Sequence, residues 1–147
     1  SYSIISVTMI RTVFLLCCTL AAKAVLGQNH NIAMKIQGAS KYPARIAYEV
    51  LNFDAVSIAV GFIDVQDEYT FYEIAVDVSE LFAVQIYEDA NGNSKLDRGL
   101  FTQPLEKYAF SNNAWQAFSK PEVGEMFVQK TGSKTLLTFT LKSVTNF

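Results

Sequence analysis

The sequence predicts an all-β domain, an antiparallel β-sandwich of about seven strands with one long ordered loop. Apolar and polar residues alternate with a period of two along most of the chain after residue 28, which is the pattern of half-buried strands. Gly, Pro, Asn and Asp separate the alternating runs, as expected for turns. Short strands with turns between them are typical of two packed antiparallel sheets.

The strands are predicted from alternation and from their aromatic and β-branched residues. Only residues 44–51 contain enough helix formers to compete with a strand, and one helix there would not change the class. The run at 125–130 is expected to pair with the last strand, which follows a turn at 131–133. In chain order the predicted strands are residues 32–37, 45–50, 58–62, 69–78, 81–87, 125–130 and 135–142.

Residues 1–27 are predicted to be a leader and signal peptide that is cleaved, leaving a single domain over residues 28–147. Arg11 precedes an apolar run at 12–22, and small residues lead to Gly27, where cleavage is expected. The alternative, a retained anchor, is disfavoured because the run is too short to span a bilayer. A lipoprotein site is disfavoured because no small residues precede Cys17 and Cys18.

The composition left after the leader excludes several classes of function. Both cysteines leave with the leader, and ten basic and fourteen acidic residues remain. Without a basic patch, nucleic acid is not expected as a partner. The one histidine, His30, lies close to the new N-terminus, so neither a zinc cluster nor a nucleophile–His pair is expected. We therefore predict that the protein is not an enzyme.

The nonapeptide at residues 89–97 is the most specific motif in the chain. Asp89, Asn91, Asn93 and Asp97 place side-chain oxygens at loop positions 1, 3, 5 and 9, and the carbonyl of Lys95 stands at position 7. This alternation surrounds a hard cation with oxygen donors. The sequence therefore predicts a Ca²⁺ site at these five residues.

The match to a helix–loop–helix calcium loop fails at two positions. Position 6 is Ser94 where that loop has glycine, and position 12 is Leu100 where it has a bidentate glutamate. Water, Gln103 or Glu106 would have to complete the coordination, and so weakly charged a site is expected to bind with a Kd of about 10⁻⁴ to 10⁻³ M. The alternative is an Asn-Gly turn held by its own side-chain hydrogen bonds without an ion.

Alternation disappears between residues 89 and 123, which predicts a long functional or self-packed loop. Glu106 is a candidate metal ligand or catalytic acid; the alternative is a carboxylate that accepts hydrogen bonds from loop amides. The aromatic residues of this region are candidates for a platform that binds sugars or peptides, and the alternative is packing against the sandwich. They are Tyr108, Phe110, Trp115 and Phe118.

A third set of acidic residues, Asp64, Asp67 and Glu68, follows the third predicted strand. These residues could include a carboxylate pair of the glycosidase kind. Because they cluster in a turn, a solvent-exposed hairpin end is the favoured interpretation.

The region from residue 81 to residue 113 contains a dense set of characteristic residues. They are Asp89, Asn91, Gly92, Asn93, Lys95, Leu96, Asp97, Phe101, Pro104, Glu106, Tyr108, Phe110, Ser111, Asn112 and Asn113. With this set the region resembles the domain of unknown function 2141 family, and the resemblance implies an exported bacterial protein with a small β-sandwich and no established activity. The chain departs from the family pattern where glycine is usual, at Ser94, Thr102 and Ala109, and it has Ser79–Val84 where a Pro-Pro-Gly turn is usual.

Together these features predict an exported, non-enzymatic β-sandwich in the periplasm or outside a bacterial cell, with no transmembrane segment after cleavage. Its loop at 89–113 would be organised by Ca²⁺, or by an equivalent hydrogen-bond network, and would face an envelope or extracellular partner. One alternative is a carbohydrate- or peptide-binding module that uses Tyr108, Trp115 and their neighbours. Another is a hydrolase that uses Glu106 and Asp97.

Overall fold

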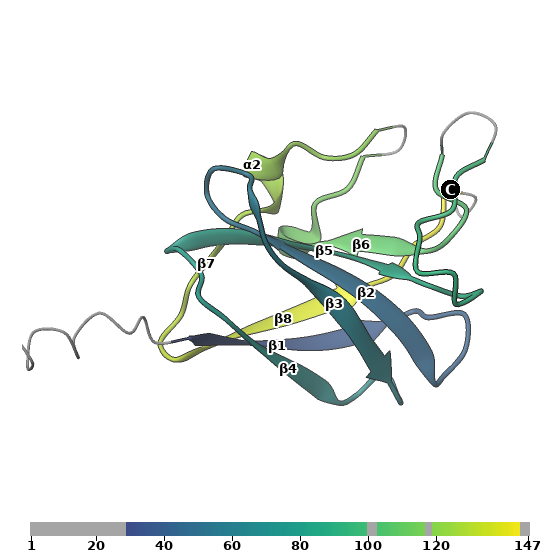
Figure 1. The fold of residues 1–147 in the computed structure, drawn as a ribbon, viewed down its shortest axis with the longest axis horizontal. Coiled ribbons are helices and arrows are strands. Elements are labelled where there is room, and N and C mark those ends of the chain that lie inside the picture. The colour runs from purple at the N-terminus through teal and green to yellow at the C-terminus, as the bar shows by residue number, and fades with distance from the viewer. Residues whose placement is uncertain (1–28, 100–102, 117–118, 145–147) are drawn as a thin grey trace, which may run out of the picture.

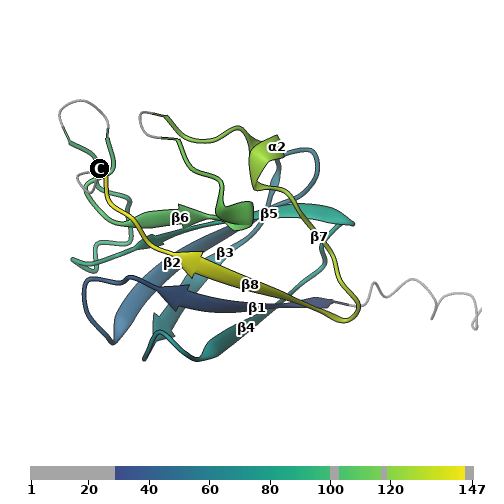
Figure 2. The same ribbon diagram turned by 180° about the vertical axis from the view of Figure 1, so that it is seen from behind.

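The computed structural model describes residues 29–99, 103–116 and 119–144, and these residues form two stacked β-sheets with very little helix (Figures 1 and 2). The predicted all-β class is confirmed. The predicted leader at residues 1–27 lies outside the described residues, as do Leu100 and Phe118. Within the described part of the chain, no helix is long and apolar enough to cross a membrane.

Eight strands, one 3₁₀ turn and one short helix make up the described structure. The strands agree with the predicted runs to within a few residues over most of the chain. In order, the elements are β1 (His30–Gln37), β2 (Ala44–Leu51), β3 (Ser57–Val65), β4 (Phe71–Val76), β5 (Leu81–Glu88), β6 (Tyr108–Phe110), η2 (Ser111–Asn113), α2 (Val123–Met126), β7 (Val128–Gln129) and β8 (Lys134–Thr140).

The strands divide into a sheet of order β4-β1-β8 and a five-stranded sheet of order β3-β2-β5-β6, in which β7 pairs with the start of β5. One pairing differs from the antiparallel prediction, because β1 and β8 run parallel, with Asn31 opposite Lys134 and Gln37 opposite Thr140. The chain reaches β8 from β7 in the other sheet and enters beside the start of β1, where the amide of Asn31 donates to the carbonyl of Ser133 over 3.2 Å. Period-two alternation does not reveal this direction.

The core lies between the two sheets and is built by the inward-facing member of each alternating pair. Burial of these side chains is the main stabilising contribution to such a fold. β-Branched residues and aromatic residues dominate it, which explains why these runs form strands. The largest fully buried apolar side chains on the strands are Ile32, Met34, Ile36, Ile46, Val50, Val65, Phe82, Val84 and Phe139.

The predicted strand at 125–130 is wrong in extent and in partner. Glu122 and Glu125 form a capping box that closes one turn of helix, α2, so that only Val128 and Gln129 remain extended. This short strand pairs with β5 and not with the last strand. The side chain of Met126, which α2 carries, is fully buried.

The region at 89–123 also contains more regular structure than the sequence predicts. Strand β6 pairs antiparallel with β5, with Tyr108 opposite Tyr87. The buried hydroxyl of Ser111 explains why the chain turns directly after β6: it accepts from the amide of Val84 over 2.9 Å and donates to the carbonyl of Met126 over 2.6 Å.

The acidic turn after β3 connects the two sheets and is not the end of a hairpin, because β3 and β4 belong to different sheets. Asp64 lies within β3, opposite Arg45 of β2. The side chain of Asp67 accepts from the amides of Tyr69 and Thr70, each over 2.8 Å, which holds the turn. These hydrogen bonds lower the pKa of Asp67 and support a structural role.

Candidate functional site

The loop that follows β5 is anchored to the sheet at both of its ends. At its start, the amide of Asp89 donates to the carbonyl of Arg45 over 2.9 Å. Where the chain returns, the amide of Glu88 donates to the carbonyl of Lys107 over 2.8 Å. Figure 1 shows this loop at the end of the sandwich where the C-terminal segment also lies. The nine-residue motif is therefore held in place by the strands on either side.

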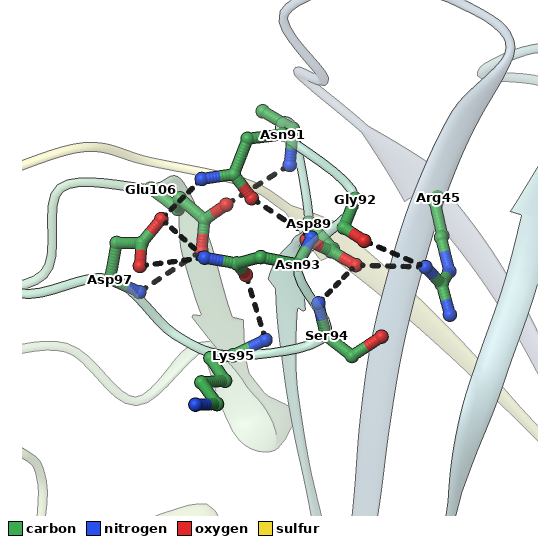
Figure 3. A network of polar contacts seen from close by, with 10 residues as sticks. Arg45, Asp89, Asn91, Gly92, Asn93, Ser94, Lys95, Asp97 and Glu106 are labelled. Atoms are coloured by element: carbon green, nitrogen blue, oxygen red, sulfur yellow. Dashed lines mark hydrogen bonds and ion pairs between the residues drawn. The ribbon is translucent and has the colours of Figure 1, made fainter.

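Asp89, at position 1 of the motif, is the most buried acidic group of the loop, with 3% of its surface exposed. Its Oδ2 accepts from the amide of Ser94 over 3.1 Å and lies 3.2 Å from Nη1 of Arg45 (Figure 3). Its Oδ1 is buried and has no hydrogen-bond partner among the described residues. An unpaired buried oxygen is costly, which indicates that this carboxylate is positioned for a further interaction.

The backbone of the motif turns through two residues of positive φ. Gly92 has φ +71°, as the Asn-Gly pair predicts, and Ser94 has φ +63°. Ser94 stands at the position where a calcium loop has glycine, and it adopts the conformation that glycine would take there. The hydrogen bond from the Ser94 amide to the Asp89 carboxylate helps to hold that conformation.

Asn91, Asn93 and Asp97 converge on one another. Nδ2 of Asn91 donates to Oδ2 of Asp97 over 2.5 Å, and Nδ2 of Asn93 donates to the two oxygens of Asp97 over 2.9 and 3.1 Å. The amide oxygens face the backbone: Oδ1 of Asn91 accepts from the amide of Asn93 over 3.1 Å, and Oδ1 of Asn93 accepts from the amide of Lys95 over 2.9 Å. This arrangement is the hydrogen-bonded network that the sequence offers as the alternative to an ion.

Glu106 returns to the loop from the segment before β6 and is 8% exposed. Its Oε1 accepts from the amide of Ala90 over 3.1 Å, and its Oε2 accepts from the amide of Asp97 over 3.2 Å. Burial raises the pKa of this carboxyl, and the charges of Asp97 and Asp89 raise it further. The two hydrogen bonds from backbone amides oppose this shift. Glu106 thus holds the two ends of the motif together.

The structure brings the predicted residues into one network but does not place Asp89 and Asp97 on a shared partner. Figure 3 shows Asp97 on one side of Asn93, and Asp89 with Arg45 on the other. Among the described residues, no group of three or more His, Cys, Asp or Glu side chains is arranged to hold a metal ion. A cation here would therefore depend on amide and carbonyl oxygens as well as on carboxylates.

Arg45 belongs to this site, although motif analysis did not select it. It lies 44 positions before Asp89 in the sequence, and only the pairing of β2 with β5 brings the two together. Its guanidinium lies 4.0 Å from the centre of the Phe62 ring, and Nη1 donates to the carbonyl of Gly92 over 3.5 Å. No pattern in the sequence around Arg45 indicates this contact.

The aromatic residues after the motif pack against one another. The rings of Tyr108 and Trp115 are stacked, with centroids 5.0 Å apart and an angle of 18° between their planes, and the ring of Phe110 contacts Tyr108 edge-on at 5.6 Å. Tyr108 is buried, which raises its pKa. These rings do not form the exposed side-by-side platform that a sugar would stack on, and their arrangement is that of the packing alternative.

A groove of about 1230 Å³ lies over the outer face of the five-stranded sheet, and the loop forms part of its wall. Its lining is largely apolar. Among the described residues, Glu106 and Asp97 do not line it, so the two carboxylates of the hydrolase alternative do not face this space. The lining residues include Ala47, Val60, Phe62 and Tyr87 from the sheet and Leu96, Arg98, Pro104 and Leu105 from the loop.

A family model described as an uncharacterized protein conserved in bacteria (DUF2141) matches residues 57–137, more than half of the chain. The chain belongs to this family. The DUF2141 match includes β3 to β7, the whole polar motif and Glu106, and it ends within β8. The resemblance inferred from the sequence is thus confirmed. Neither the curated proteins nor the solved structures contain a match to this chain.

Proposed function

We propose that this DUF2141 protein is an exported, non-enzymatic β-sandwich whose loop at 89–97 binds Ca²⁺ as a structural ion. The observation that carries the proposal is the buried Oδ1 of Asp89, which has no hydrogen-bond partner in the described part of a loop that also contains Asp97 and Glu106. Asp89 pairs with Arg45, whereas Asp97 and Glu106 accept their printed hydrogen bonds from neutral amide groups. A divalent cation would add positive charge beside these carboxylates.

The donor set suits a hard cation with flexible coordination. Asp89 and Asp97 would supply carboxylate oxygens, Asn91 and Asn93 amide oxygens, and Lys95 its carbonyl. Because an amide has its donor and acceptor at the ends of one planar group, a half-turn of the Asn91 and Asn93 side chains would direct their oxygens towards Asp97. This rotation would break the two hydrogen bonds that the Asn91 and Asn93 oxygens accept from backbone amides, which is consistent with weak binding.

Isothermal titration calorimetry with CaCl₂ tests the proposal directly. We expect one site with a Kd of about 10⁻⁴ to 10⁻³ M, the range of extracellular calcium modules. Asp97→Asn and Asp89→Asn should each weaken binding at least tenfold. Asp54→Asn, an exposed carboxylate in the β2–β3 turn, is the matched control and should bind as the wild type does. Absence of heat attributable to binding in the wild type would contradict the proposal.

The groove over the outer face of the sheet favours a second candidate function, a binding module for an apolar envelope component. Its volume is slightly above the usual range of small-molecule sites, and apolar side chains with a few polar groups line it, as in such sites. Leu105, which is 61% exposed, stands on the loop wall. Leu105→Asp should then weaken the binding of an apolar fluorescent probe such as anilinonaphthalene sulfonate, whereas Leu136→Asp on the other sheet should not.

A further inference from the structure

Strand β3 is a long free edge of the five-stranded sheet. It runs from Ser57 to Val65 and pairs with β2 along one side, and no described strand pairs with its other side. The opposite edge of the same sheet is formed by β6 and β7, which have three and two residues. In the other sheet, the edge strand β4 has six residues with Glu73 near its centre, and the chain just beyond β8 bridges to Tyr108.

The side chains of β3 lack the usual protection of a free edge. Lysine and proline are absent from it, and Asp64, near its end, is its only charged residue. Val60 is 69% exposed and Phe62 is 43% exposed, and both face the outer side of the sheet. An exposed apolar edge strand of this kind is a template for the addition of another strand.

We propose that β3 is a self-association surface, on which β3 of a second copy of the chain pairs antiparallel about a twofold axis through Gly61. The pairing of β2 with β3 shifts register next to Ile58, so the regular part of the edge begins at Ala59. Centring the axis on Gly61 pairs residues 59–63 of the two copies. The result is one continuous sheet across both copies.

This register brings apolar side chains together and places no two charged residues of β3 opposite each other. It places Val60 of each copy opposite Phe62 of the other, a β-branched residue beside an aromatic one on the same face. Asp64 lies opposite Ile58 and not opposite another carboxylate. The two Asp64 residues are offset by six positions, about 20 Å at roughly 3.4 Å per residue, so screening by salt removes most of their repulsion. A second copy therefore meets no charge barrier along this edge.

Sedimentation velocity over a wide concentration series tests the surface. We expect the wild type to shift from monomer to dimer as concentration rises. Val60→Lys should keep the protein monomeric, and because Val60 is exposed the substitution should leave the fold intact. Leu136→Lys, at a residue 62% exposed on the other sheet, is the control and should dimerise like the wild type. A monomeric wild type, or a Val60→Lys variant that still dimerises, would overturn the proposal.

Cysteine cross-linking tests the register in a background in which Cys17 and Cys18 are replaced by serine. A mixture of Val60→Cys and Phe62→Cys proteins should form the disulfide between the two variants faster than either variant forms one with itself. Equal rates, or a mixture of Val60→Cys with Leu136→Cys that reacts as fast, would overturn this register. The association requires no ion at the loop, so its outcome is independent of Ca²⁺ binding.

Discussion

Arg45 and Asp89 form the ion pair that joins strand β2 to the polar loop, with Nη1 3.2 Å from Oδ2. The side chain of Asp89 is completely buried, whereas that of Arg45 is 38% exposed. The arginine therefore neutralises one oxygen of a carboxylate that cannot reach water, and the other oxygen, Oδ1, has no hydrogen-bond partner among the described residues.

Arg45→Ala should lower the free energy of unfolding by about 1–3 kcal/mol, because it leaves the buried Asp89 carboxylate without its cation. The loss should be smaller in saturating Ca²⁺, since the ion would supply positive charge at the same carboxylate. Urea denaturation with and without Ca²⁺ measures both effects. Lys41→Ala, at an exposed lysine, is the control. An equal loss in both conditions would separate Arg45 from the ion.

Glu106→Ala should destabilise the protein by about 1–3 kcal/mol, because the amides of Ala90 and Asp97 both lose their acceptor. Glu106→Gln keeps one acceptor oxygen and removes the charge, so its effect should be smaller.

The pKa of Glu106 is raised in the folded protein. Protonation therefore favours the folded state, and the wild type should gain stability relative to Glu106→Gln as the pH falls through that raised pKa. Parallel denaturation curves from pH 7 to pH 4 make the comparison.

His30 should make the protein less stable in mild acid. The residue is 2% exposed, and its Nε2 lies 2.7 Å from the hydroxyl oxygen of Thr135. Burial lowers its pKa, and the charge of Lys130 adds to that effect. The folded state therefore resists protonation. The His30 contribution to the free energy of unfolding is fully present above the unfolded-state pKa of 6.5, and it decreases as the pH falls below that value, by at most about 1.4 kcal/mol per pH unit. His30→Gln should flatten this dependence between pH 8 and pH 5. An unchanged slope would contradict it.

Strands β1 to β5 and β8 could be predicted from sequence because period-two alternation, or a run of aromatic and β-branched residues, marks each of them. The parallel pairing of β8 with β1 could not, because alternation carries no information on strand direction or partner. Strand β6 was missed because three residues are too few to show a period. Its position also depends on the hydrogen bond between the Ser111 hydroxyl and the amide of Val84, which is distant in the sequence.

The polar loop was predictable as a motif because its Asp and Asn residues recur at regular intervals, but the separate partners of Asp89 and Asp97 were not predicted. Glu106 was selected as a metal ligand, a catalytic acid or an acceptor for loop amides, and its hydrogen bonds from the amides of Ala90 and Asp97 correspond to the last of these roles. Arg45 was not predictable, because its contact with Asp89 arises from sheet pairing across 44 positions. Long-range contacts of this kind have no local signature.

The most direct test of the central claim is thermal unfolding of the wild type and of Asp89→Ala, in EDTA and in graded Ca²⁺, with Mg²⁺ as the control ion. At Ca²⁺ about a hundred times the Kd, the wild type should gain about 2.7 kcal/mol. That gain corresponds to a rise in Tm of roughly ten degrees for a domain of this size. Asp89→Ala should show no rise. A wild-type Tm that is the same in EDTA and in 10 mM Ca²⁺ would contradict the account.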